Sequence, residues 1–222
     1  MRMRGTLMLA GLAIGLAVAA SPATAQPAGA TPVVAEVADW ATATGDNGGL
    51  PFMVLDKTGA AVFMYDSAGQ LLGAAPVLIG AAIGDDSAAG IGNRELHDIK
   101  PEERTTPAGR FVVQLGRAIG KYPRVLWVSY ADSIALHPVI TSNPREQRRQ
   151  RLNSPTPADN RITYGCINVS ADFYRDIVQP LFANSIGIAY VLPESRQLAE
   201  VIPGFRPIPA QLHATAEMTE AR

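Results

Sequence analysis

This 222-residue chain has only one cysteine and three histidines. The single cysteine, Cys166, excludes an internal disulfide, so packing must stabilise the fold. The histidines are scattered and no H-E-x-x-H pattern occurs, so we expect neither a metal site nor a cofactor. The formal net charge is −1, which gives no sign of the basic surface that binds nucleic acid or an anionic membrane.

The early apolar run is too short for a membrane span. It covers residues 7–20, about 14 residues, whereas a transmembrane helix needs roughly 20. Arginines precede it, and the A-x-A pattern of Ala23 and Ala25 follows, as in a secretory signal peptide. We therefore expect a signal peptide over residues 1–25 and no membrane span after its cleavage. The mature protein is expected in the periplasm or cell-wall space.

The remaining chain is long enough for one domain with a sizeable core. Residues 26–50 are expected to form a linker and a short N-terminal helix, because apolar residues from Val33 to Ala41 recur at helical spacing. The domain itself is assigned to residues 51–193. Residues 194–222 are assigned to a C-terminal extension.

Short β-rich runs dominate the domain. PFMVLD, AAVFMYD and LLGAAPVLIG predict a meander of antiparallel strands. GRFVVQLG, RVLWVSY and SIALH predict further strands, the last of which ends at His137, and SIGIAYVL predicts a late buried strand. Residues 84–106 are rich in glycine and charge and are expected to be a loop. The pattern is typical of a mainly β fold with a few short helices.

Two helices are expected in the second half of the chain. In SNPREQRRQRL, Asn143 is a candidate N-cap and Pro144 occupies the first helical position, which predicts a highly basic helix over residues 144–152. Ser170 is the candidate N-cap of a second helix, ADFYRDIVQPLF.

The lone cysteine lies where a nucleophile is often held. Cys166 follows Gly165, and we expect a tight turn in which the N–H groups of both residues face a developing oxyanion. His137 is the candidate base that makes Cys166 a reactive thiolate at neutral pH. The alternative interpretation is a buried, inert thiol, which is the common state of a lone cysteine.

The residues around Cys166 resemble a known catalytic signature. TYGCIN, residues 163–168, is similar to the [S/T]-x-G-C-x-N motif of the L,D-transpeptidase (YkuD-type) catalytic domain. TPAGRF at residues 106–111 and ALH at the upstream strand end agree with it, and the resemblance covers residues 52–192. It implies a β-sandwich-like fold of packed sheets in which the cysteine and the histidine face one cleft.

The resemblance also implies a reaction. In the family, the cysteine attacks the carbonyl before the terminal D-alanine of a peptidoglycan stem tetrapeptide, and an amine from a second stem resolves the thioester as a 3→3 cross-link. Carried over by position, Cys166 is the nucleophile, His137 is the base, and the Pro138 carbonyl orients the imidazole. Carbapenem-type inhibitors are implied to acylate the cysteine. The oxyanion or orienting positions of the signature are Thr163, Tyr164, Gly165 and Asn168.

Two features depart from the family. Tyr164 replaces the usual histidine before the motif glycine, and the 29 positions between His137 and Cys166 exceed the usual spacing. The extra length holds the basic helix, which is either a solvated charged face or a lid that binds stem-peptide carboxylates. The candidate substrate-binding residues are Arg145, Arg148, Arg149, Arg151 and Arg161.

Several functions stay open at this point. A hydrolase of the same chemistry, a carboxypeptidase or endopeptidase, differs from the transpeptidase only in whether water or an amine accepts the acyl group. A catalytically lapsed peptidoglycan-binding module is a further alternative, which Tyr164 favours. A papain-like peptidase is disfavoured, because its cysteine usually precedes its histidine and only His213 follows Cys166 here.

Overall fold

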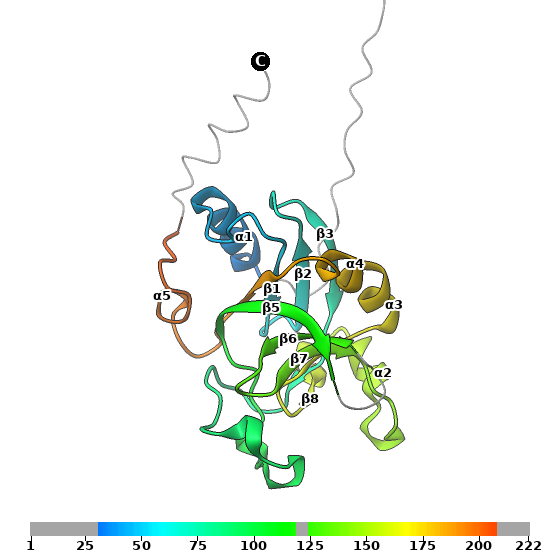
Figure 1. Cartoon of the computed structure of the whole chain (residues 1–222). Helices are drawn as coiled ribbons and strands as arrows, with labels where there is room; N and C mark the ends of the chain where they lie inside the picture. Colours follow the sequence, from blue (N-terminus) through cyan, green and yellow to red (C-terminus); the bar gives the residue numbers. More distant parts are fainter. Residues whose placement is uncertain (1–30, 119–123, 208–222) are drawn as a thin grey trace, which may run out of the picture.

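The computed structural model describes residues 31–118 and 124–207 (Figure 1). The expected signal peptide and the end of the C-terminal extension lie outside these residues. Eight strands form one mixed sheet in the order β3-β2-β1-β10-β5-β6-β7-β9, and β4 and β8 form a separate pair. The prediction of a mainly β fold with a few short helices is confirmed.

The strands are β1 (Phe52–Asp56), β2 (Ala61–Tyr65), β3 (Leu71–Pro76), β4 (Ile79–Gly80), β5 (Gly109–Arg117), β6 (Arg124–Ser129), β7 (Ile134–Pro138), β8 (Arg161–Thr163), β9 (Ile167–Val169) and β10 (Gly187–Val191). The α-helices are α1 (Val33–Thr44), α2 (Arg148–Leu152), α3 (Ala171–Phe173), α4 (Gln179–Phe182) and α5 (Leu198–Val201). Short 3-10 turns are η1 (Ile91–Asn93), η2 (Leu96–Asp98), η3 (Pro101–Glu103), η4 (Pro144–Glu146) and η5 (Pro157–Asn160), and η6 (Tyr174–Val178) is a π-helical segment.

The predicted meander is present as β1, β2 and β3, which pair antiparallel in succession. The last part of the third run behaves differently, because β4 leaves the large sheet and pairs in parallel with β8. The late strand β10 is fully buried, as predicted, and lies between β1 and β5. It pairs parallel with β1 and antiparallel with β5, which makes the sheet mixed.

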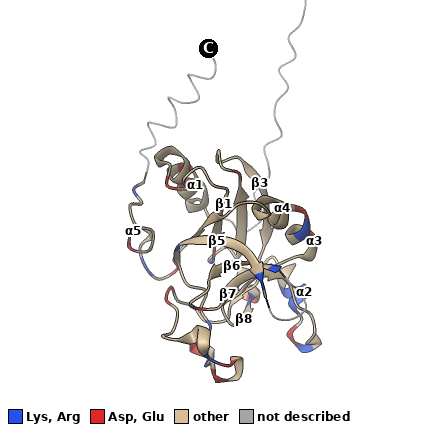
Figure 2. Cartoon of the chain, in the orientation of Figure 1, with Lys and Arg blue, Asp and Glu red and all other residues tan. Residues whose placement is uncertain are grey.

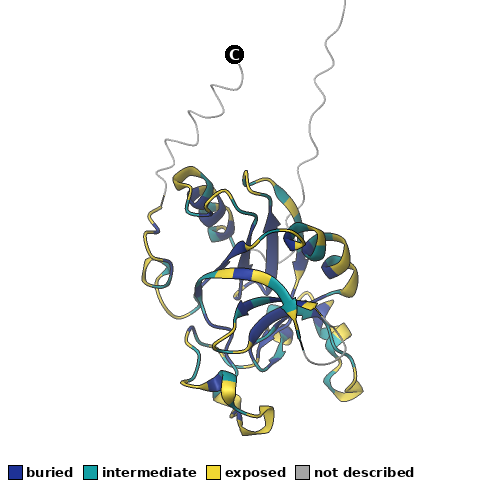
Figure 3. Ribbon diagram, viewed as in Figure 1, coloured by how far each residue is buried: buried dark blue, intermediate teal, exposed yellow. Residues whose placement is uncertain are grey.

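Two hydrophobic clusters lie on opposite faces of β1, β2 and β10, which are therefore buried on both sides (Figure 3). Met53 and Leu55 point into the first cluster, together with side chains of β6, β7, β9 and the helical segment after Ser170. Phe52 and Val54 point into the second cluster, with α1 and residues 198–205. The start of the C-terminal extension thus packs on the domain.

Strand β5 joins the two parts of the sheet. Its first five residues pair with β10 and its last four pair with β6. The strand curves visibly between these partners (Figure 1). Because the sheet bends here, side chains from β1 and β2 share one core with those from β6 and β7. At the end of this part of the sheet, β9 is the edge strand and lies beside β7.

Helix predictions at the two ends of the domain are confirmed. Helix α1 ends at Thr44, where Gly45 adopts a left-handed conformation with φ 69°. Ser170 caps the second helix, since its hydroxyl accepts the Phe173 N–H at 3.1 Å. This helix runs through α3, η6 and α4. Its π segment lies just before Pro180, which has no N–H to donate to the preceding turn.

The prediction of one basic helix over residues 144–152 is wrong. The segment consists of η4 and the five-residue α2, separated by Gln147 with φ 49°. Asn143 does cap the first turn, because its side chain accepts the Arg145 N–H. Glu146 binds Arg148 across the break, with 2.5 Å between Oε2 and Nε. After the break, Arg148 reaches Asn168 of β9, with 3.0 Å between Nη1 and Oδ1.

Within residues 31–118 and 124–207, no helix has both the length and the apolar character needed to cross a membrane.

Candidate active site

The candidate site lies on one face of the parallel pair β7 and β9. His137 pairs with Asn168 in the register, and Leu136 pairs with Ile167. Side chains alternate along a strand, and Leu136 and Ile167 are fully buried in the first hydrophobic cluster. His137 and Asn168 therefore occupy the opposite face. Cys166 lies immediately before β9, two residues from Asn168, so the same alternation directs it toward that face.

Two threonines hold the turn that presents Cys166. The Thr163 hydroxyl donates to the Cys166 carbonyl at 2.6 Å and accepts the Gly165 N–H at 3.1 Å. The Thr106 hydroxyl donates to the Gly165 carbonyl at 2.8 Å and accepts the Gly80 N–H at 2.9 Å. The TYGCIN and TPAGRF segments, 57 positions apart at their first residues, thus meet at this turn. Sequence reasoning had no signal for the direct contact of Thr106.

Gly165 is required by this turn. Its φ is +126°, and a Cβ at this position would lie 2.6 Å from both the Thr105 carbonyl oxygen and Ile134 Cδ1. The expectation that the Gly165 N–H faces an oxyanion is wrong, because that N–H is used by Thr163 within the turn. The Cys166 N–H is left as the candidate donor from this pair.

The His137 ring is held from both sides. Its Nδ1 lies 2.8 Å from the Pro138 carbonyl oxygen, the group expected to orient it. Its Nε2 lies 3.1 Å from Asn168 Nδ2, and Asn168 Oδ1 accepts from Arg148 Nη1 at 3.0 Å. Arginine only donates hydrogen bonds, so Arg148 requires Oδ1 on its own side and turns the amide NH₂ toward the imidazole. Nε2 is then the acceptor, and the Nδ1–H donates to Pro138.

Arg148 is thus a site residue, and its role differs from the predicted lid. It is half-buried and acts on the imidazole through Asn168, which is fully buried. Burial lowers the pKa of His137 below its ordinary value of 6.5, and the Arg148 charge lowers it further against the effect of the Pro138 carbonyl. The network therefore holds a neutral imidazole at neutral pH.

Cys166 lies against the start of β7. Its Sγ is 3.7 Å from the Ser133 carbonyl oxygen, and the residue is partly exposed. Burial of the sulfur raises the pKa of the thiol above its ordinary value of 9.0, which outweighs the lowering by the Ala135 backbone and by Arg148. In the part of the chain that the structure describes, no hydrogen bond joins Sγ to the imidazole. The pair rests as a neutral thiol beside a neutral imidazole.

This corrects the expectation of a thiolate at neutral pH and leads to a prediction. Because the folded protein raises the thiol pKa, alkylation of Cys166 by iodoacetamide should accelerate about tenfold per pH unit between about pH 6 and pH 9. Intact mass after timed quenching measures the rate, and a free thiol such as glutathione is the reference. A rate that is already maximal near pH 6 would mean a thiolate–imidazolium ion pair and would contradict this description.

The other predicted arginines do not converge on Cys166. Arg145 and Arg149 are exposed, and Arg151 donates to the backbone carbonyls of Glu146 and Asp159. Arg161, proposed to bind substrate, instead pairs with Glu194 and donates to the Ala82 carbonyl. Figure 2 shows the basic segment at α2. Of the five predicted arginines, only Arg148 contacts the site, and it does so through Asn168 rather than as a lid.

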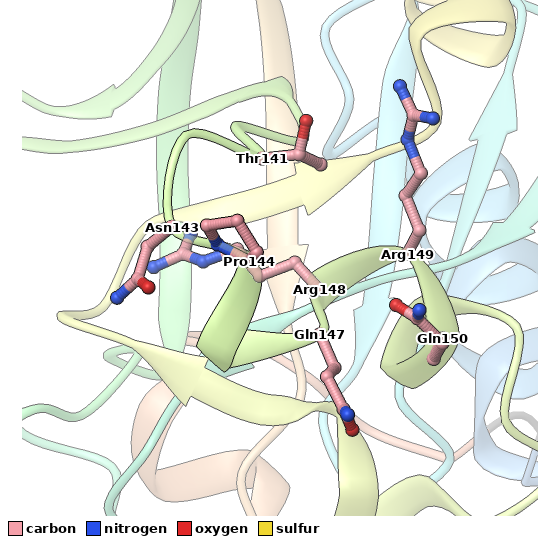
Figure 4. A pocket seen from close by; sticks show the side chains of 7 residues that line it. All are labelled: Thr141, Asn143, Pro144, Gln147, Arg148, Arg149 and Gln150. Atoms are coloured by element: carbon pink, nitrogen blue, oxygen red, sulfur yellow. The ribbon is translucent and has the colours of Figure 1, made fainter.

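A shallow hollow of about 260 Å³ adjoins this segment (Figure 4). Arg148 and Arg149 leave it in different directions, and Arg149 points away from Arg148. Cys166 is not part of its lining. The lining residues are Thr141, Asn143, Pro144, Gln147, Arg148, Arg149 and Gln150.

Tyr164 lies beside the Cys166 turn and has a partner that sequence reasoning missed. The guanidinium carbon of Arg104 is 4.1 Å from the centroid of the Tyr164 ring. His97 is exposed, and its Nε2 lies 3.4 Å from Asp98 Oδ1. Within the described residues, no cluster of three His, Cys, Asp or Glu side chains forms a metal site.

Neither a scan against protein-family models nor a search of curated proteins finds a match to this chain. The likeness to the L,D-transpeptidase signature is therefore a resemblance of motifs.

Proposed function

We propose that this chain is an exported, cysteine-dependent L,D-transpeptidase that acts on peptidoglycan stem peptides. The observation that carries the proposal is the His137 imidazole, which the Pro138 carbonyl holds at 2.8 Å on β7, the strand that pairs with β9 directly after Cys166. The mixed sheet is compatible with the β-sandwich-like fold of that family, which we propose for residues 51–193. Export rests on the sequence of residues 1–25.

In the proposed reaction, His137 Nε2 accepts and returns the proton in each step. The Cys166 thiol proton passes to His137 Nε2 while the sulfur bonds to the stem carbonyl carbon. The C–N bond to D-alanine then breaks, the leaving amine takes the proton from Nε2, and a thioester remains. An acceptor amine attacks the thioester and gives its proton to Nε2, and that proton returns to the sulfur as the C–S bond breaks. In this mechanism, the Cys166 N–H is the candidate donor to the oxyanion.

Asn168 must release the imidazole before this proton transfer. A neutral imidazole has one lone pair, on Nε2 here, and Asn168 occupies it in the resting protein. Nε2 cannot accept from the amide and the thiol at once. Asn168 therefore sets the tautomer at rest, and the exchange of its hydrogen bond for that of the thiol begins the reaction.

This arrangement predicts the effect of Asn168→Asp. An acidic oxygen facing Nε2 favours a protonated ring whose Nε2–H is donated to the new carboxylate, so the base is lost. We expect acylation at neutral pH to slow by about a hundredfold or more. The His137 pKa, followed by NMR, should rise by comparison with the wild type. A matched control is Asn153→Asp at an exposed position, which should change neither quantity.

Two results for Asn168→Asp would contradict this mechanism. If Asn168→Asp acylates at the wild-type rate with an unchanged His137 pKa, the amide does not set the tautomer. If the pKa rises while the rate is unchanged, then His137 is not the base.

Two alternative functions are each favoured by features of the site. The partial exposure of Cys166 gives water access to a thioester, which favours a carboxypeptidase or endopeptidase of the same chemistry. The occupied Nε2 and the raised thiol pKa favour a lapsed peptidoglycan-binding module.

Acylation by a carbapenem separates the enzymes from the lapsed module. The proposal expects the intact mass to rise by one carbapenem and expects Cys166→Ser to carry no stable adduct. A folded wild-type protein that gains no mass would support the lapsed module and overturn the proposal.

A further inference from the structure

Arg104 is a half-buried arginine that has no acidic partner within residues 31–118 and 124–207, and it lies beside the Cys166 turn. It follows η3, and its Nε and Nη2 both donate to the Ile99 carbonyl oxygen, at 3.3 and 3.1 Å. Its guanidinium carbon lies 4.1 Å from the centre of the Tyr164 ring. One face of the guanidinium is thus covered by an aromatic ring, and one edge is covered by a backbone carbonyl.

Two other arginines in this region each have an acidic partner, unlike Arg104. Arg94 is neutralised by Glu103, with 3.0 Å between Nη1 and Oε2, and Arg161 is neutralised by Glu194. Among the described residues, Arg104 has no carboxylate partner, and no hydrogen bond reaches its Nη1. Removing a guanidinium from water without an anion is costly, so such a group is normally paired. Its end edge, formed by Nη1 and the second N–H of Nη2, remains for a ligand.

Residues next to Arg104 in the chain contact the turn that presents the nucleophile. Tyr164 lies two residues before Cys166, and Thr106, two residues after Arg104, donates to the Gly165 carbonyl. The Thr105 carbonyl approaches Gly165 so closely that no side chain fits there. Residues 104–106 therefore run directly along the turn that presents Cys166.

We propose that Arg104, held by the Tyr164 ring, binds a free carboxylate of the peptide whose carbonyl Cys166 attacks. The end edge of a guanidinium matches the two oxygens of a carboxylate, and the ring face supports the cation without neutralising it. This gives Tyr164 a function at the position where the resembling family has histidine, because an imidazole that gained a proton would repel Arg104. The proposal rests on the proposed function for the identity of the peptide.

Equilibrium binding tests the subsite without requiring turnover. The full chain carrying Cys166→Ala is titrated by calorimetry with the stem tetrapeptide and with the same peptide whose carboxylates are amidated. We expect the free-carboxylate form to bind at least about tenfold tighter, and Arg104→Gln to remove this preference while leaving the amidated peptide unchanged. Tyr164→Phe, which keeps the ring, should retain the preference, and Tyr164→Leu should reduce it.

The outcomes are distinguishable. If Arg104→Gln keeps the preference, or if neither peptide form binds, the subsite is overturned. Iodoacetamide labelling of Cys166 in the Arg104→Gln protein with its cysteine retained should match the wild-type rate, which shows that the turn is intact. If the carboxylate preference depends on Arg104 but the wild-type protein acylates no stem peptide and no carbapenem, then the proposed enzyme function fails while the subsite stands.

Discussion

His137→Ala should slow acylation of Cys166 by a carbapenem by about 10²–10⁴-fold at neutral pH. The reason is that the thiol is neutral at rest, since burial raises its pKa, so attack requires a base that takes the proton. The neutral imidazole, with its pKa lowered by burial, is that base in the proposed mechanism. The rate is measured by intact mass after rapid mixing, and circular dichroism checks that the fold is retained.

His97→Ala is the matched control, because His97 is exposed and lies in η2. It should acylate at the wild-type rate. Exogenous imidazole should restore part of the activity of His137→Ala, since the change leaves a space at the partly exposed ring position. If His137→Ala acylates within about twofold of the wild type, the base has been wrongly identified.

Lys57→Met should lower the free energy of unfolding by about 3–5 kcal/mol. Lys57 is only 1% exposed, and its ammonium binds Asp85 at 2.7 Å and the carbonyls of Gly84 and Thr106 at 2.6 and 2.9 Å. Methionine fills a similar volume but leaves the Asp85 carboxylate and two carbonyls without this cation. Urea unfolding followed by tryptophan fluorescence measures the loss.

Two further variants control this prediction. Lys57→Met with Asp85→Asn removes both charges, so its loss should be smaller than the sum of the two single losses. Arg175→Ala removes an exposed cation that pairs with Asp172 and Asp176, and it should leave stability unchanged within error. A Lys57→Met protein as stable as the wild type would show that the ion pair does not stabilise the fold.

The ion pair of Lys57 and Asp85 also makes the stability of the wild-type protein fall at acidic pH. Burial alone would raise the pKa of Asp85, but hydrogen bonds from Lys57, Ser195 and the Glu194 backbone hold it well below its usual range. A depressed folded pKa stabilises the protein above the unfolded value of about 3.9, and that contribution is lost as the pH falls further. Because Lys57 also binds the Thr106 carbonyl, acid should loosen the base of the Cys166 turn.

Local patterns in the sequence predicted most of the elements. Short β-rich apolar runs identified the meander and β10, and a serine before an apolar helical run identified the cap at Ser170. The same local reasoning failed at Gln147, where φ is 49° and the helix is interrupted, and it did not predict that the next residue, Arg148, binds Asn168 twenty positions away. Capping residues can predict where a helix starts, but they hold no information about such distant partners.

The sequence predicted the main catalytic residues of the site, but it did not predict most of the hydrogen bonds that connect them. Cys166 and His137 stand out by chemistry, and the Pro138 carbonyl follows His137 in the chain, so its contact is local. The role of Asn168 between Arg148 and His137 depends on the parallel pairing of β7 with β9, which no local pattern encodes. Lys57 was equally hidden, because KTG between two strands is typical of an exposed turn while its ammonium is buried against Asp85.

Product analysis after incubation of the purified full chain with stem tetrapeptides tests the central claim most directly. The account predicts 3→3 cross-linked dimers, released D-alanine and a thioester on Cys166, all absent in the Cys166→Ala protein. Tripeptides alone would replace the transpeptidase by the hydrolase of the same chemistry. Unchanged tetrapeptide with a folded, peptide-binding protein would contradict the assignment of Cys166 and His137 as a working catalytic pair.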